Sequence, residues 1–240
     1  MRIKILGTGT SIPALNRFSS SYLVTVKDKN ILVDIGPSVV RRLLEFDYNV
    51  IDIDVVILTH FHVDHSADLS TFLFACNYGI KPRTKPLLLL GGIGIHRFFH
   101  GMASIYPWIK PNFYELSIKT LSKNKYLFND ILFEAIKVRH NKESIAIKIT
   151  YEKSVIFSGD TSFSRNLIKL AHNADLLITE CSFPEREVKG HLNLKSLQRI
   201  LDKAGPKKVI LSHLYPDWEH FQGVLHEPCL IGEDGMEIEL

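Results

Sequence analysis

Cysteine is scarce in this chain of 240 residues, and long apolar runs are missing. The three cysteines, Cys76, Cys181 and Cys229, are odd in number and far apart, which argues against a disulfide framework and against a cysteine zinc site. No apolar run approaches the roughly 20 residues that span a bilayer. The start of the chain turns at Gly7 before an apolar segment develops, so we do not expect a signal peptide. We therefore expect a soluble, cytoplasmic protein with no membrane partner.

Excess charge of one sign is also lacking. The formal net charge is +3 with histidine neutral, which is too mild to argue for a nucleic-acid surface by itself. Two short basic groups are present: Lys81, Arg83 and Lys85, and Lys119, Lys123 and Lys125. We expect both groups to be ordinary solvated faces. The hydrophobic content of 45% is enough for a sizeable core, and the length favours one domain over residues 1–240.

What the chain does contain is a series of buried strands and amphipathic helices. Apolar periodicity and end signals predict four helices, over residues 38–46, 67–78, 162–172 and 194–204. The stretches 125–139 and 144–157 are expected to hold three strands with short turns. The runs 55–60 and 208–213 resemble each other, and each ends in a histidine. Two such halves suggest two facing sheets with the helices on their outer faces.

Four metal-binding side chains follow the apolar run 55–58 within six positions: His60, His62, Asp64 and His65. Neutral imidazole and carboxylate suit zinc and its borderline neighbours. If the strand geometry persists, His60 and His62 point the same way, whereas Asp64 and His65 follow after the chain has turned. Two pairs aimed at two points suggest two metal ions. The alternative is a polar loop with a chance cluster of histidines.

Three further donors, His140, Asp160 and His213, each lie at the end of a predicted strand. Any one of them alone would be better explained as a capping or core residue. Together with the first four, they meet the requirement of two zinc-like ions for three or four protein ligands each, with one carboxylate shared. Asp34 also ends a strand, and we expect it to have a buried supporting role.

The combination of these motifs resembles the metallo-β-lactamase superfamily of dinuclear hydrolases. The motif is His60-x-His62-x-Asp64-His65, followed by the single residues His140, Asp160 and His213. The opening Leu6-Gly7-Thr8-Gly9-Thr10-Ser11-Ile12-Pro13 resembles the start of ribonuclease Z and its relatives. Gly190-His191 lies between the Asp160 and His213 motifs, as the Gly-His element of that family does. The resemblance covers the chain from Ile3 to about Leu214.

This resemblance implies an α/β fold of the αββα type, a four-layer sandwich of two facing mixed β-sheets with helices outside. It assigns His60, His62 and His140 to a first metal ion, Asp64, His65 and His213 to a second, and Asp160 to a bridge between them. The cofactors would be two divalent metal ions, with Zn²⁺ expected first and Mn²⁺ or Fe²⁺ as alternatives.

The resemblance also implies catalytic roles. His191 would protonate the leaving oxygen, and Asp64 would orient the attacking water as well as bind metal. Glu180 could orient His191, although a solvated or hydrogen-bonded glutamate at a strand end is an equally good interpretation. For His191, the alternative is an ordinary loop histidine.

One departure from ribonuclease Z concerns the substrate. In ribonuclease Z proper, a long tRNA-gripping arm is inserted between the residues that correspond to His140 and Asp160, whereas only 19 residues separate them here. We therefore expect a phosphodiesterase that acts on a small-molecule or short single-stranded phosphodiester, and not on tRNA. The alternatives are a lactone, thioester or carboxylic ester hydrolase, or a non-catalytic metal-binding accessory protein. A homodimer is plausible, because a neighbour could complete an open site, and residues 102–113 form either a packed loop or an apolar wall beside it.

Overall fold

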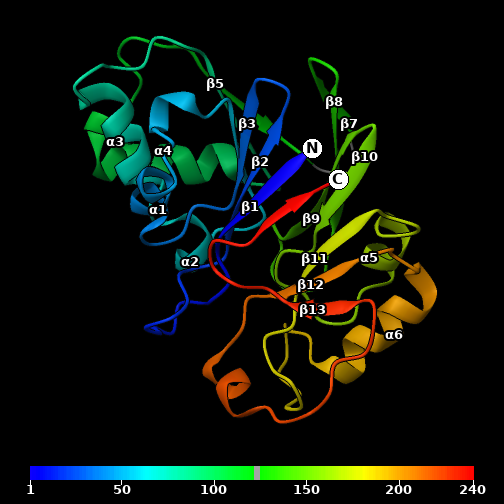
Figure 1. The fold of residues 1–240 in the computed structure, drawn as a ribbon. Coiled ribbons are helices and arrows are strands. Elements are labelled where there is room, and N and C mark those ends of the chain that lie inside the picture. Colours follow the sequence, from blue (N-terminus) through cyan, green and yellow to red (C-terminus); the bar gives the residue numbers. More distant parts are fainter. Residues whose placement is uncertain (122–124) are drawn as a thin grey trace.

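The computed structural model describes residues 1–121 and 125–240, so that Lys123 lies outside the described part of the chain. Its strands form two seven-stranded sheets that face each other (Figure 1). The first sheet has the order β14 (Glu237–Glu239), β1 (Arg2–Gly7), β2 (Ser21–Val26), β3 (Lys29–Val33), β4 (Val55–Leu58), β5 (Leu87–Gly91) and β6 (Leu116–Thr120). It is antiparallel from β14 to β3 and parallel from β3 to β6.

The second sheet has the order β13 (Cys229–Ile231), β12 (Val209–Ser212), β11 (Leu176–Glu180), β10 (Lys153–Phe157), β9 (Ile145–Tyr151), β8 (Ile131–Lys137) and β7 (Lys125–Phe128). It is parallel from β13 to β10 and antiparallel from β10 to β7. The two stretches predicted to hold three strands therefore hold four. The prediction was wrong because Asn129 turns the chain with a positive φ of 52°, which splits 125–139 into the hairpin β7–β8.

The helices cover the outer faces of the two sheets (Figure 1). They are α1 (Val39–Glu45), α2 (Val63–Ser66), α3 (Leu69–Tyr78), α4 (Ile95–Ile105), α5 (Arg165–Leu170) and α6 (Leu194–Ala204), with 3₁₀ turns η1 (Val50–Asp52), η2 (Pro107–Ile109) and η3 (Pro216–His220). Helices α1, α3 and α4 pack on the first sheet, and α5 and α6 on the second. The four predicted helices are confirmed with somewhat shorter ends. Residues 102–113 contain the end of α4 and the turn η2.

Alternation along each central strand builds the core. Val55 and Ile57 of β4 face the second sheet, whereas Val56 and Leu58 face the helices. Because both faces are covered, all four residues are buried, which explains the continuous apolar run in the sequence. Sheet on sheet, with a helical layer outside each, is the αββα sandwich expected from the sequence. The single-domain assignment of residues 1–240 stays a prediction.

Two further expectations concern the solvation of a basic group and the presence of membrane-spanning helices. Arg83 is only 1% exposed, so the expectation of a solvated face was wrong for this residue. Its guanidinium donates to five backbone carbonyl oxygens at 2.7 to 3.3 Å, which replaces its hydration. Within the described residues, no helix has the length and apolar character needed to cross a bilayer.

Candidate metal centre

The candidate site lies where carboxyl ends of parallel strands from both sheets meet. The segment after β4 carries His60, His62, Asp64 and His65, while Asp160 follows β10 and His213 follows β12. His140 lies just beyond β8. In open α/β sheets, ligands bind outside the carboxyl ends of the strands, because polar loop residues gather there.

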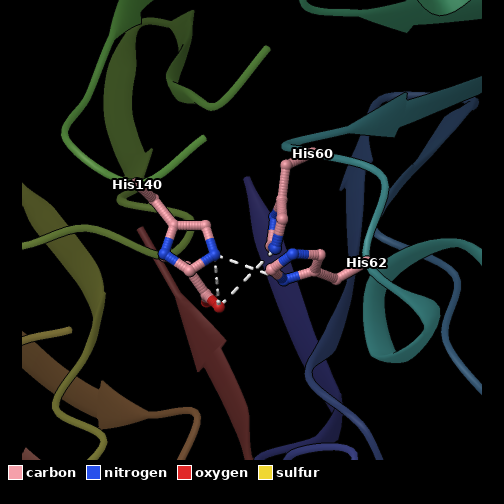
Figure 2. A group of neighbouring side chains, drawn as sticks. His60, His62 and His140 are labelled. Carbon is pink, nitrogen blue, oxygen red and sulfur yellow. Dashed lines mark hydrogen bonds and ion pairs between the residues drawn. The ribbon is translucent and has the colours of Figure 1, made fainter. Parts of the chain in front are cut away.

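His60 and His62 converge, but not for the reason that strand alternation suggested. Strand β4 ends at Leu58, so the strand geometry does not persist, and His62 has already become the N-cap of α2. The rings of His60 and His62 nevertheless lie 4.7 Å apart, and that of His140 lies 5.0 Å from His60 (Figure 2). The strand-to-helix turn brings the pair together. Asp64 and His65 lie on α2 itself, after the turn, as expected.

The donor atoms of the described residues form three groups, and within each group one ligand atom from every member lies within 4.8 Å of the others. The first group contains His60, His62, His140 and Asp160, and the second contains Asp64, His65 and His213. These two groups are the ligand sets that the resemblance implied, with Asp160 included in the first. The third group contains Asp160, His191 and His213, so His191, which the resemblance makes a proton donor, also lies among candidate metal ligands.

Asp160 faces the first two groups with different oxygen atoms. Its Oδ2 lies 3.6 Å from Nε2 of His60 and 3.8 Å from Nε2 of His140. Its Oδ1 lies 3.4 Å from Nε2 of His65 and 3.4 Å from Nε2 of His213. The carboxylate is therefore positioned as a bridge would need to be.

Three buried polar atoms at this point have no hydrogen-bond partner: Nε2 of His60, Nε2 of His65 and Oδ1 of Asp160. Buried polar atoms in native proteins are almost always paired, because an unpaired one loses its hydration without replacement. Imidazole nitrogens and a carboxylate oxygen that converge on one space are suited to divalent cations. The residues present therefore fit the metal ions that the sequence predicts.

Burial and neighbouring charges shift the pKa values of several candidate ligands. Burial lowers the pKa of His60 well below its usual value, and the neighbouring His65 lowers it further, so this imidazole is neutral with a free lone pair. Burial alone would raise the pKa of Asp160, but the imidazoles of His213 and His65 lower it well below the usual range. For His65, burial is outweighed by the carboxylates of Asp160 and Asp34, which raise its pKa well above normal. These two carboxylates stabilise a positive charge at His65, which either a proton or a metal ion can supply.

Supporting groups orient the candidate ligands from outside. Asp34 lies 2.8 Å from Nδ1 of His65 and accepts hydrogen bonds from the backbone and the hydroxyl of Thr59. This contact directs Nε2 of His65 toward Asp160. The buried supporting role expected of Asp34 is confirmed. Nδ1 of His140 donates to the carbonyl oxygen of Gly190 at 2.9 Å, which orients a second candidate ligand in the same way.

His191 borders the centre and contacts Glu180, which is 3% exposed. Nδ1 of His191 lies 3.3 Å from Oε1 of Glu180 and 3.9 Å from Oδ2 of Asp160. Burial lowers the pKa of His191, but the hydrogen bond and the charge of Glu180 outweigh it and raise the pKa above its usual value. Backbone N–H groups of Thr161, Ser182 and Leu192 donate to Glu180. Glu180 is therefore not solvated. It is a hydrogen-bonded glutamate at the end of β11 that also contacts His191.

Ser182 is a site residue that sequence reasoning missed. Its hydroxyl donates to Oε2 of Glu180 at 2.6 Å, and it lies 3.0 Å from Nδ1 of both His191 and His213. A hydroxyl has one proton and two lone pairs, so all of its bonding capacity is used. This arrangement places protons on Nδ1 of both rings and leaves Nε2 of His213 facing Asp160. Serine has no ligand signature, and only its position two residues after Glu180 could have indicated the role. Asn141, whose Nδ2 lies 2.8 Å from Nε2 of His62, was missed as well.

The two facing sheets and their shared donor set define a metallo-hydrolase of the metallo-β-lactamase fold. A family model described as anti-Pycsar protein Apyc1 matches residues 1–232. The chain belongs to this family.

Relatives and solved structures agree with this class. The chain is 30% identical over 226 residues to a probable metallo-hydrolase, YhfI of Bacillus subtilis, covering 89% of this chain and 87% of that protein. The crystal structure of YhfI superposes with a TM-score of 0.83 over 99% of this chain and 98% of that one, at 25% identity. Ribonuclease Z of Clostridium botulinum is 25% identical over 181 residues, covering 69% of this chain and 56% of the relative, so the chain spans little more than half of that protein. Human tRNase Z, short form, shares the fold with a TM-score of 0.83 at 20% identity, over 100% of this chain and 99% of that one.

Proposed function

We propose that this protein is a dinuclear metal-dependent phosphodiesterase that acts on a small or single-stranded phosphodiester. The observation that carries the proposal is the position of Asp160, whose two oxygens face two separate donor groups at 3.4 to 3.8 Å. Two divalent ions held by these groups would supply charge stabilisation to both the attacking and the leaving oxygen of an in-line displacement at phosphorus. The similarity to proteins named ribonuclease Z supports the same reaction class.

In this proposal the seven donors are metal ligands. His60, His62 and His140 would hold one ion, Asp64, His65 and His213 would hold the other, and Asp160 would contribute a carboxylate oxygen to each. Bound divalent ions, Zn²⁺ or alternatively Mn²⁺ or Fe²⁺, lower the pKa of a water molecule and neutralise charge on the phosphate oxygens. Asp34 and the Gly190 carbonyl hold His65 and His140 in the orientation that binding requires. Asp64, which accepts from the backbone N–H of Ser11 at 3.1 Å, would also orient the attacking water.

His191 is the proposed general acid. Its raised pKa favours the protonated ring, which can supply a proton to the leaving oxygen. Glu180 is held in place by several hydrogen bonds that it accepts, and it can hold the ring before and after the transfer. Glu180 is therefore proposed as the residue that orients His191.

The proposed substrate is small because the region that would hold a tRNA-gripping arm is short. Between His140 and Asp160 the chain contains only β9, a turn and β10. Both strands are paired inside the second sheet, so nothing from this span projects as an arm. A homodimer remains part of the proposal.

The experiment that tests the function compares leaving groups in the metal-loaded enzyme. His191→Ala should lower turnover of a dinucleotide about 10²- to 10⁴-fold, since its sugar alkoxide needs a proton. Turnover of bis(p-nitrophenyl) phosphate should fall much less, because nitrophenolate leaves without one. The control is His96→Ala, because His96 is an exposed histidine on α4 that belongs to none of the donor groups.

The outcomes separate the alternatives. Equal loss on both substrates would remove the general-acid assignment. A metal-loaded protein that is inert towards linear and cyclic phosphodiesters would overturn the phosphodiesterase itself. Turnover of lactones, thioesters or carboxylic esters instead would identify the other hydrolase class.

A further inference from the structure

Asn141 follows one candidate metal ligand in the chain and contacts another. It comes directly after His140, and its side-chain amide lies 2.8 Å from Nε2 of His62. The two residues that make this contact are 79 positions apart and belong to opposite halves of the fold. The proposed function assigns no role to the contact, although it involves one of the seven donors.

The turn that carries Asn141 is fixed to both sheets. The hydroxyl of the buried Ser144 accepts from the backbone N–H of Asn141 at 3.0 Å, and the N–H of Ser144 donates to the carbonyl oxygen of Asn141 at 3.3 Å. One residue further, the N–H of Ile145 donates at 3.0 Å to the carbonyl oxygen of Thr59, which directly precedes His60. These contacts use only the backbone of Asn141. Its side chain is therefore held beside the segment that carries the first ligands.

Nδ1 of His62 is the ring nitrogen that faces the first group of donors. It lies 3.2 Å from Nε2 of His140, the atom that also faces Oδ2 of Asp160 at 3.8 Å (Figure 2). His60 and His140 differ from His62, because both direct Nε2 toward this carboxylate. Asn141 therefore contacts the other nitrogen of the His62 ring, outside the donor group.

The chemistry of imidazole decides what Asn141 must offer. A neutral ring has one N–H and one lone pair, so a ring that binds metal through Nδ1 carries its proton on Nε2 and donates from there. An amide nitrogen beside Nε2 would instead donate to it and leave the proton of His62 on Nδ1, directed at His140. A carboxamide rotated by 180° places its oxygen at the same point with the same shape. The oxygen of Asn141 is the atom that fits a metal-binding His62.

His62 depends on such a contact more than the other ligands do. Its ring is exposed, whereas His60 is fully buried and the side chain of His140 is 8% exposed. An exposed side chain loses rotamer freedom when it is ordered, which opposes binding. An acceptor on the second nitrogen fixes both the orientation and the tautomer of a metal-binding imidazole.

We propose that Asn141 is a positioning residue that selects the metal-binding tautomer of His62. Its side-chain oxygen accepts from the Nε2–H of the ring and leaves the lone pair of Nδ1 directed at the first group of donors. The inference rests on the metal centre of the proposed function and adds a supporting group for its most exposed ligand. Asn141 itself contacts neither ion nor substrate, and its effect passes through His62.

Three variants separate an acceptor from a donor and from simple charge. Asn141→Leu keeps the branched shape without polar atoms, and it should weaken Zn²⁺ binding at one of the two sites about 10- to 100-fold. Asn141→Asp presents only acceptors, so it should bind Zn²⁺ at least as tightly as the wild type. Lys142→Gln makes the same change of one charge unit at the adjacent exposed residue and should leave both affinities close to wild type. Competition with a chromophoric chelator measures both sites.

Nitrogen NMR of the imidazole rings in the zinc-loaded protein identifies the tautomers. We expect the proton of His62 on Nε2, and those of His60 and His140 on Nδ1. In Asn141→Leu the Nε2 proton of His62 should exchange with water faster, because no acceptor holds it. A residue that only stabilised its own turn would not change this exchange. If Asn141→Leu does not fold, Asn141→Ala replaces it.

The inference is overturned if Asn141→Leu binds Zn²⁺ as the wild type does, or if it loses affinity equally at both sites. A loss in Asn141→Asp as large as that in Asn141→Leu overturns it, as does a proton on Nδ1 of His62 in the zinc-loaded protein. None of these measurements needs a substrate. If they agree with the expectation but no diester is cleaved, the proposed function fails. If diesters are cleaved and metal binding does not depend on Asn141, only this inference is wrong.

Discussion

The carbonyl oxygen of Gly190 accepts a hydrogen bond from Nδ1 of His140 at 2.9 Å. The contact is close because Gly190 has a φ of +94°, a conformation that residues with a Cβ rarely adopt. A Cβ built on Gly190 would lie 2.9 Å from the same nitrogen of His140. The residue just before the proposed general acid therefore also orients a candidate metal ligand.

Gly190→Ala should weaken metal binding. The added methyl group pushes His140 away, and loss of such a supporting contact costs about 10- to 100-fold in metal affinity. Competition with a chromophoric chelator measures this directly. The matched control is Gly101→Ala in α4, where no atom lies within 4 Å of the new Cβ, and alanine should raise stability by up to about 1 kcal/mol. Unchanged affinity in Gly190→Ala would contradict the role of this contact.

Ser182→Ala should lower both stability and metal affinity. The change leaves Nδ1 of His191 and Nδ1 of His213 without the hydroxyl, so we expect a loss of about 1–3 kcal/mol in the free energy of unfolding. Metal affinity should fall about tenfold or more because His213 loses its orientation. Ser164→Ala, which removes the N-cap of α5, should cost a similar stability with no change in affinity. If both variants bind metal equally well, Ser182 is only structural.

Asp175 predicts a pH dependence far from the metal centre. The hydrogen bond from Lys207 lowers its pKa to about 2, against the opposing effect of burial and with help from the backbone of Ser154. Because the folded pKa lies below the unfolded value of 3.8, the contribution is present above about pH 4 and is lost as the pH falls towards 2. Asp175→Asn should therefore destabilise by about 1 kcal/mol at pH 7, and less at pH 3.

Urea unfolding at pH 7, 4.5 and 3 measures this difference. The control is Asp130→Asn, since Asp130 is paired with Lys27 but is 75% exposed, and it should have little effect at any of these pH values. A difference for Asp175→Asn that is the same at pH 7 and pH 3 would rule out the linkage.

Arg83 should be among the most sensitive positions for stability. Arg83→Met leaves five carbonyl oxygens without their donor, two of them from the segment at Val50 and Ile51, so we expect a loss of about 3–5 kcal/mol. Arg83→Lys should restore part of the lost stability. Lysine has three donors but lacks the planar, forked geometry of the guanidinium. Lys81→Met, in the same basic group but exposed, should change stability by less than about 0.5 kcal/mol. Thermal or urea unfolding distinguishes these outcomes.

The main elements could be predicted from the sequence because their signals are local. The apolar runs of β4 and β12 and the stripes of α3 and α6 follow from burial on one face or on both. The donors at strand ends could be predicted in the same way, because they follow apolar runs in the sequence. What the sequence could not supply were partnerships made across the fold, such as Ser182 with His213 and Arg83 with the carbonyl of Ile53.

Two errors have the same physical origin. The basic group around Arg83 was expected to be solvated, because charged side chains usually remain in water. Arg83 is buried instead because the surrounding backbone carbonyl groups replace its hydration. His60 and His62 were expected to share a direction by strand alternation, yet β4 stops at Leu58 and a turn brings them together. In each case a tertiary arrangement replaced a local rule.

The candidate ligands come from both sheets: His60, His62, Asp64 and His65 from the first, and His140, Asp160 and His213 from the second. Asp64 and His213 lie 3.2 Å apart but are 149 positions apart in the chain. A metal ion bound here would therefore connect the two sheets through its ligands. Part of the free energy of metal binding would then stabilise the association of the two sheets. Core substitutions between the sheets, remote from every ligand, should weaken metal binding, and a chelator should loosen that core.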